Sequence, residues 1–193
     1  MDREEKLACL RLIRTPNIGP TTFSLLFKGA DDYPARLAQF DDAPPVLSVR
    51  GSPHLLSRPS VGVVGARNAS INAQRLAQSL AEDLATEGYV IVSGLARGID
   101  AAAHNGALAG GTMAVIAGGI DIIYPPENAD LHESIAETVL LVADMPPGTQ
   151  PTPRYFPIRN RIIGPLALGV VVVEAAERRG SLITARGRRV ATT

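Results

Sequence analysis

Residues 91–104 read IVSGLARGIDAAAH, and this stretch decides the fold class. A β-branched apolar run ends at Ser93-Gly94, and an alanine-rich helical pattern begins a few residues later. The loop between them contains Gly94, Gly98 and one positive charge, Arg97. A buried strand that passes into a helix through a loop with so few side chains is typical of α/β proteins. Glycines also let another molecule approach the backbone closely, so the loop predicts a contact site.

The same rhythm continues from residue 60 onward. Continuous apolar runs alternate with helical patterns, and the runs contain few polar residues, as in strands that are buried on both faces. We therefore predict an α/β fold with a Rossmann-like, mostly parallel sheet and helices on both faces. The expected strands are residues 61–66, 89–94, 112–119, 139–144 and 169–176, and the expected helices are 72–88, 98–111 and 124–138.

The first 60 residues have a different pattern. Apolar residues recur at helical spacings in residues 1–45, which predicts a small all-helical domain resembling helix-hairpin-helix or SAM domains. Residues 46–60 are rich in proline and serine and are expected to be a linker. Residues 61–193 then form the Rossmann-like domain.

Composition narrows the function classes. The chain has a single cysteine, Cys9, so it forms no internal disulfide, and we expect a reducing, cytoplasmic location. No apolar run reaches the length of a membrane span, and the acidic N-terminus does not resemble a signal peptide. The net charge is zero, but residues 154–193 carry eight arginines and two glutamates, a net charge of +6.

Glycine accompanied by arginine or a hydroxyl group follows several of the expected strands. In open α/β sheets, ligands bind beyond the carboxyl ends of the strands. Free N–H groups at the following helix favour an anion, so these turns predict a phosphate cradle. The candidates at the first two turns are Gly65, Arg67, Ser93, Gly94, Arg97 and Gly98. The alternative is that each glycine only permits a tight turn, because neither the dinucleotide fingerprint nor the P-loop pattern is present.

Aromatic residues and arginines alternate in the segment RYFPIRNRII, residues 154–163. This pattern favours bases that stack on rings beside backbone phosphates. In the alternative interpretation Phe156 anchors the segment to the core while the arginines are solvated. The histidines lack metal-ligand spacing, and Ser93 has no histidine partner in the sequence, so we predict neither a metal nor a catalytic triad.

Five motifs in this order resemble the DNA-processing protein A family, also called DprA or Smf. They are VGVVGARNAS, IVSGLARGIDAAAH, AVIAGGIDIIYPPEN, FPIRNRIIGPLALGVVVVEA and GSLITA, which together run from Val61 to Ala185. Residues 1–45 resemble the small helical amino-terminal domain of that family.

The resemblance implies a binding protein and not an enzyme, with no cofactor. It implies that the protein binds single-stranded DNA without sequence preference, shields it from nucleases and delivers it to the RecA recombinase in natural transformation. It also implies the phosphate-binding positions, which are Arg67, the Ser93-Gly94 turn with Arg97, the segment Arg159, Asn160 and Arg161, and the turn with Gly180, Ser181 and Thr184.

The sequence departs from the family pattern after Ala185, where RGRRVATT follows at once. We therefore expect the Rossmann-like domain to be incomplete at its carboxyl end. The resemblance also implies a homodimer, which in the family involves the carboxyl half of the domain. Two rival interpretations stay open: a nucleotide-binding enzyme resembling phosphoribohydrolases, with Glu174 as its carboxylate, and a non-functional remnant.

Overall fold

The computed structural model describes residues 23–174. Seven strands form one sheet in the order β1-β2-β6-β5-β4-β3-β7. The strands are β1 (Ser24–Phe27), β2 (Val46–Gly51), β3 (Ser60–Gly65), β4 (Val90–Ser93), β5 (Thr112–Gly119), β6 (Leu140–Met145) and β7 (Val170–Val173). Strands β3 to β7 are parallel, whereas β1 and β2 are antiparallel to their neighbours. The predicted Rossmann-like, mostly parallel sheet is confirmed.

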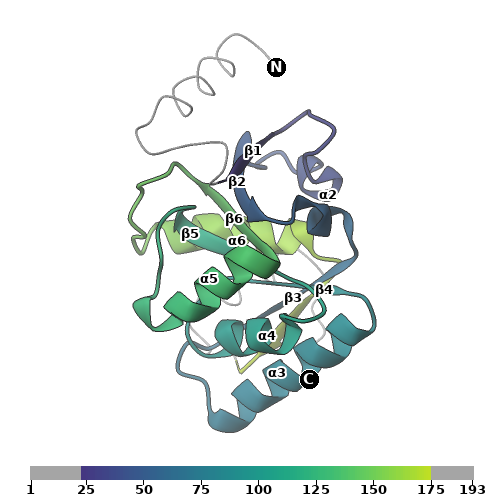
Figure 1. The fold of residues 1–193 in the computed structure, drawn as a ribbon, viewed down its shortest axis with the longest axis vertical. Helices are drawn as coiled ribbons and strands as arrows, with labels where there is room; N and C mark the ends of the chain where they lie inside the picture. The colour runs from purple at the N-terminus through teal and green to yellow at the C-terminus, as the bar shows by residue number, and fades with distance from the viewer. Residues whose placement is uncertain (1–22, 175–193) are drawn as a thin grey trace.

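Helices cover both faces of this sheet (Figure 1). Helix α3 packs against α4, α4 packs on the central strands β3 to β5, and α5 lies beside α4, while α6 covers the opposite face. The helices are α2 (Ala35–Ala38), α3 (Ile71–Thr86), α4 (Ile99–Ala107), α5 (Ala129–Thr138) and α6 (Tyr155–Leu166), and two 3-10 turns are η1 (Pro53–Ser57) and η2 (Pro126–Asn128). Alternate residues of β3 point to the two sides, with Val63 under α3 and α4 and Val64 in the larger core with α6.

Two amino-terminal expectations were wrong. Residues 24–27 form β1 instead of a helix, and residues 46–51 form β2 instead of a linker. Strand pairing explains both differences. β1 forms backbone hydrogen bonds with β2, and β2 pairs with the edge of β6 that faces away from β5. Local helical spacing is a weaker constraint than the ladder of backbone hydrogen bonds and the burial of Leu26 and Leu47. Expectations for residues 1–22 lie outside the described residues.

The sheet order places a switch point beside β3. The chain moves from β3 through β4 and β5 to β6, and it then crosses back by way of α6 to place β7 on the other side of β3. The loops after β3, β4 and β5 therefore meet at one edge of the sheet. Ligands of open α/β sheets bind at such an edge.

The close contact of α3 and α4 yields a stability prediction. A Cβ at Gly106 of α4 would overlap the backbone carbonyl of Gln78 in α3. An alanine inside a helix is otherwise favoured over glycine. We expect Gly106→Ala to lower the free energy of unfolding by about 1–3 kcal/mol because the helices must separate. Gly169→Ala is the matched control, since no atom lies within 4 Å of its Cβ position. Denaturant unfolding measures both, and an unchanged Gly106→Ala stability would contradict this packing.

Candidate nucleic-acid interface

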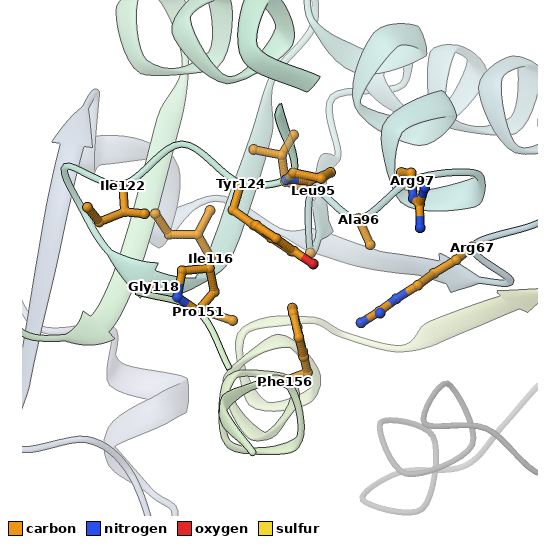
Figure 2. A pocket seen from close by; sticks show the side chains of 13 residues that line it. Arg67, Leu95, Ala96, Arg97, Ile116, Gly118, Ile122, Tyr124, Pro151 and Phe156 are labelled. Atoms are coloured by element: carbon orange, nitrogen blue, oxygen red, sulfur yellow. The ribbon is translucent and has the colours of Figure 1, made fainter. Parts of the chain in front are cut away.

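A cleft opens at the carboxyl edge of the central strands (Figure 2). It encloses about 450 Å³, including the open solvent at its mouth. The loop after β4 and the segment after β5 form two of its walls, and Arg67 and Phe156 close it from β3 and α6. The lining residues are Arg67, Gly94, Leu95, Ala96, Arg97, Ile116, Ala117, Gly118, Ile122, Tyr124, Pro125, Pro151 and Phe156.

Arg67 lies over an aromatic row. Its guanidinium carbon is 4.5 Å from the ring centroid of Phe156, and the rings of Phe156 and Tyr124 are 5.9 Å apart at 43°. Figure 2 shows Arg67 extending across the cleft toward Phe156, with Tyr124 on the other side. Stacking holds the guanidinium in place without neutralising its charge. The cleft therefore presents a positive charge beside two ring faces.

The loop after β4 is fixed by its own neighbours. The carboxylate of Asp100 accepts hydrogen bonds from the N–H groups of Gly94 at 3.2 Å and Ala96 at 3.4 Å. The side chain of Asn128 donates to the carbonyl of Leu95 at 3.0 Å. Leu95 is buried and has φ of 55°, a conformation that non-glycine residues adopt only when their surroundings enforce it. The N–H groups of Gly94 and Ala96 are thus bound by Asp100 within the protein.

The glycines of the predicted cradle are required by packing. The Cβ position of Gly65 is filled by the Val173 carbonyl and Ile99, and that of Gly94 by the guanidinium of Arg159. Gly98 has φ of 75°, and its Cβ position coincides with the carbonyl of Ala66. Close packing accounts for Gly65 and Gly94, and the turn conformation accounts for Gly98. The phosphate hypothesis then depends on the side chains and not on the glycines.

Ser93 and Arg159 lie under the cleft and not in it. Ser93 is buried, and its hydroxyl donates to the carbonyl of Val63 at 2.6 Å. Arg159 is only 4% exposed and donates to the carbonyls of Gly94 and of Val115, the latter at 2.7 Å. The structure therefore gives both side chains internal partners, where the sequence predicted phosphate contacts.

Asp100 is the counter-charge of Arg159. Burial raises the pKa of Asp100, while the charge of Arg159 and the backbone hydrogen bonds oppose that rise. Burial likewise lowers the pKa of Arg159, and Asp100 opposes it. Each charge therefore makes the burial of the other tolerable. Arg159 lies on a helix 59 positions further along the chain, so its proximity to Asp100 carries no sequence signal.

The remaining predicted site residues divide into three groups. Arg97 is exposed and forms an ion pair with Glu127 at 3.3 Å. Arg161 of α6 pairs with Asp144 at the end of β6, at 3.6 Å, and Asn160 lies between the two arginines on α6. Gly180, Ser181 and Thr184 lie outside the described residues.

Glu174 and Tyr155, which the sequence hypotheses placed at the site, do not line the cleft. The carboxylate of Glu174 accepts from the Ser70 hydroxyl at 2.6 Å, at the start of α3, and Glu174 is not among the residues that line the cleft. Tyr155 contacts Arg154 and is also not a lining residue. Tyr124 was missed, although the carboxyl-edge rule that identified the other loops applies equally to the segment after β5. No group of three His, Cys, Asp or Glu side chains within residues 23–174 could hold a metal ion.

The family is settled by two sequence profiles. The profile described as DNA recombination-mediator protein A matches residues 24–190. The profile described as a DprA-like N-terminal HHH domain matches residues 3–40. The chain belongs to the DNA recombination-mediator protein A family. This confirms the family resemblance of the five motifs.

Relatives in this family share the sequence over most of this chain. The DNA processing protein DprA of Bacillus subtilis is 43% identical over 156 residues, which are 79% of this chain and 52% of that protein. Its counterpart in Streptococcus pneumoniae is 45% identical over 165 residues, 84% of this chain and 57% of that protein. The chain thus spans about half the length of these curated relatives.

Two solved structures of the family share the fold. DNA processing protein A from Streptococcus pneumoniae superposes with a TM-score of 0.85 at 38% identity, covering 100% of this chain and 66% of that one. DNA processing protein A from Helicobacter pylori gives a TM-score of 0.81 at 28% identity, covering 88% and 80%. The latter structure is described as giving insight into the protein's single-stranded DNA binding mode. Within residues 23–174, no helix is long and apolar enough to span a bilayer.

The buried position of Arg159 yields a second prediction. Arg159→Met leaves Asp100 buried without a counter-charge and removes the donor from two carbonyls. Leaving a buried polar group without its partner costs about 1–3 kcal/mol, and two carbonyls are affected, so we expect a large fall in the melting temperature. Arg154→Met is the control, because Arg154 lies exposed at the start of the same helix. An unchanged melting temperature for Arg159→Met would show that Arg159 is not a structural residue.

Proposed function

We propose that this chain is a DNA-processing protein that binds single-stranded DNA in the cleft at the carboxyl edge of its sheet. The observation that carries the proposal is the alignment of Arg67 with Phe156 and Tyr124, a cation next to two ring faces. Single-stranded nucleic acids are bound by this combination, since charge attracts the backbone and rings stack with any base. The single-stranded DNA binding of the Helicobacter pylori relative supports the same substrate.

In this proposal the exposed residues of the cleft contact the DNA, and the buried residues hold the loop in place. Arg67 and Arg97 are exposed at the cleft and contact phosphates, whereas Phe156 and Tyr124 stack with bases. Ser93, Gly94 and Arg159 hold the loop that carries Arg97. No lining residue carries a carboxylate, and the carboxylate of Glu174 binds Ser70, so the geometry does not favour the hydrolase alternative.

We extend the proposal to the wider role that the family resemblance implies. The bound strand is shielded from nucleases and handed to the RecA recombinase during natural transformation. The family description, a mediator of DNA recombination, supports this extension. A RecA-loading assay on DNA coated with single-strand-binding protein tests it, and no stimulation by a chain that binds DNA would contradict it.

Fluorescence anisotropy of a labelled oligo-dT strand tests the binding site directly. We expect Arg67→Ala to weaken binding about tenfold, because a charge-assisted phosphate contact is lost. The salt dependence should also fall by about 0.7 in the slope of log K against log salt concentration, the contribution of one phosphate on a single strand. Both effects follow from the loss of one cation.

The control is Arg36→Ala, which removes the same charge from an exposed position on α2 that does not line the cleft. We expect it to change the affinity less than twofold. Equal weakening by Arg36→Ala and Arg67→Ala would mean that only net charge matters, and the proposed site would be wrong.

A further inference from the structure

The η2 turn (Pro126–Asn128) contacts the loop after β4 through two adjacent side chains. Asn128 donates to the carbonyl of Leu95 at 3.0 Å, and a carboxylate oxygen of Glu127 lies 3.3 Å from a guanidinium nitrogen of Arg97. The Asn128 hydrogen bond fixes the turn against the loop. Glu127 is therefore held beside Arg97 by the fold and does not meet it by chance at a mobile surface.

The two exposed arginines of the cleft differ in the group that lies beside the guanidinium. Arg67 stacks over Phe156, a contact that leaves its positive charge available. Arg97 is already paired with a carboxylate, and its side chain and that of Glu127 are each 57% exposed. Among the described residues, Glu127 is the one ion-pair partner of Arg97. An approaching phosphate thus meets one cation that stacks on a ring and one that has a carboxylate beside it.

We infer that Glu127 competes with the DNA phosphate for Arg97 and thereby sets the affinity of the cleft. The inference rests on the proposed function, because it concerns the same loop. Glu127 accepts from one nitrogen of the Arg97 guanidinium, so an approaching phosphate meets a carboxylate that repels it and that already uses one of the donors. Binding of the strand exchanges the Glu127 carboxylate for a phosphate oxygen.

The exposure of the pair makes this exchange feasible. Ion pairs between exposed side chains are weak because water screens the charges and the long side chains lose freedom on pairing. A strand that is already bound at Arg67 presents its next phosphates at a high local concentration. A single free phosphate lacks that advantage. Glu127 therefore discriminates against isolated anions and keeps the bound strand releasable.

A double-mutant cycle measures the competition. Anisotropy with labelled oligo-dT is recorded at low salt for the wild-type chain, Glu127→Gln, Arg97→Ala and the double variant. We expect Glu127→Gln to bind about threefold more tightly, in line with the small energy of exposed pairs. The gain should shrink as salt is added, because screening weakens both interactions. In the Arg97→Ala background the same substitution should give no gain.

Glu137→Gln is the matched control. Glu137 is exposed on α5, and its substitution changes the net charge by the same amount. We expect it to leave the affinity unchanged. An equal gain from Glu137→Gln, or a gain from Glu127→Gln that persists without Arg97, would reduce the effect to long-range charge and overturn the inference.

The outcomes separate the inference from the proposed function. Strand binding that Arg67→Ala weakens but Glu127→Gln leaves unchanged overturns the inference alone. Failure of the folded wild-type chain to bind oligo-dT overturns the proposed function and the inference with it. Tighter binding by Glu127→Gln that requires Arg97 supports both.

Discussion

The guanidinium of Arg159, buried where α6 crosses the sheet, joins four elements of the structure. It donates to Gly94 after β4 and to Val115 of β5, and its charge faces Asp100 of α4. An ion in the interior is costly to desolvate, and a nearby counter-charge and hydrogen bonds offset that cost. Asp100 supplies the counter-charge and accepts hydrogen bonds from the N–H groups of Gly94 and Ala96, while the Nε of Arg159 is buried without a hydrogen-bond partner among the described residues. The loop backbone is thus held from below by the buried side chains of Asp100 and Arg159.

This arrangement explains why buried and exposed charges have separate roles. The buried side chains of Asp100 and Arg159 order the loop backbone, which lowers the entropy cost of ordering it when a ligand binds. The exposed arginines, Arg67 and Arg97, stand on that ordered frame and face the cleft. Arg161 repeats the structural role at lower burial, since it links α6 to Asp144 at the end of β6. One helix therefore contacts the loop after β4, the middle of β5 and the carboxyl end of β6.

The sequence predicted the sheet and the edge at which the cleft lies. Apolar runs and glycine-ended strands have strong local signals, and β3 to β7 lie close to the expected positions. The edge rule also located Arg67 and Arg97, and the alternation of aromatic residues and arginines identified Phe156. Neither pattern separates residues that face the cleft from residues beneath it. Ser93 was therefore assigned to phosphate by the edge rule, and Arg159 by the family resemblance.

Other features depend on contacts between distant segments. The spacing of Leu26 and Phe27 suits a helix as well as a strand, and only pairing with β2 decides between them. The Arg159–Asp100 pair spans two helices, and the Glu127–Arg97 pair spans two loops, so neither follows from local pattern. In both cases the sequence contains the partner residue but gives no signal that the two residues lie close together in the fold.

Arg159 supports the cleft from below, and we propose that exposed side chains hold the strand. A crystal structure of this chain with a short oligo-dT strand tests this division of roles most directly. We predict a phosphate within hydrogen-bonding distance of Arg67, a base against Phe156, and Arg159 still bonded to the carbonyls of Gly94 and Val115. A strand bound on another face, or Arg159 turned outward to a phosphate, would contradict it.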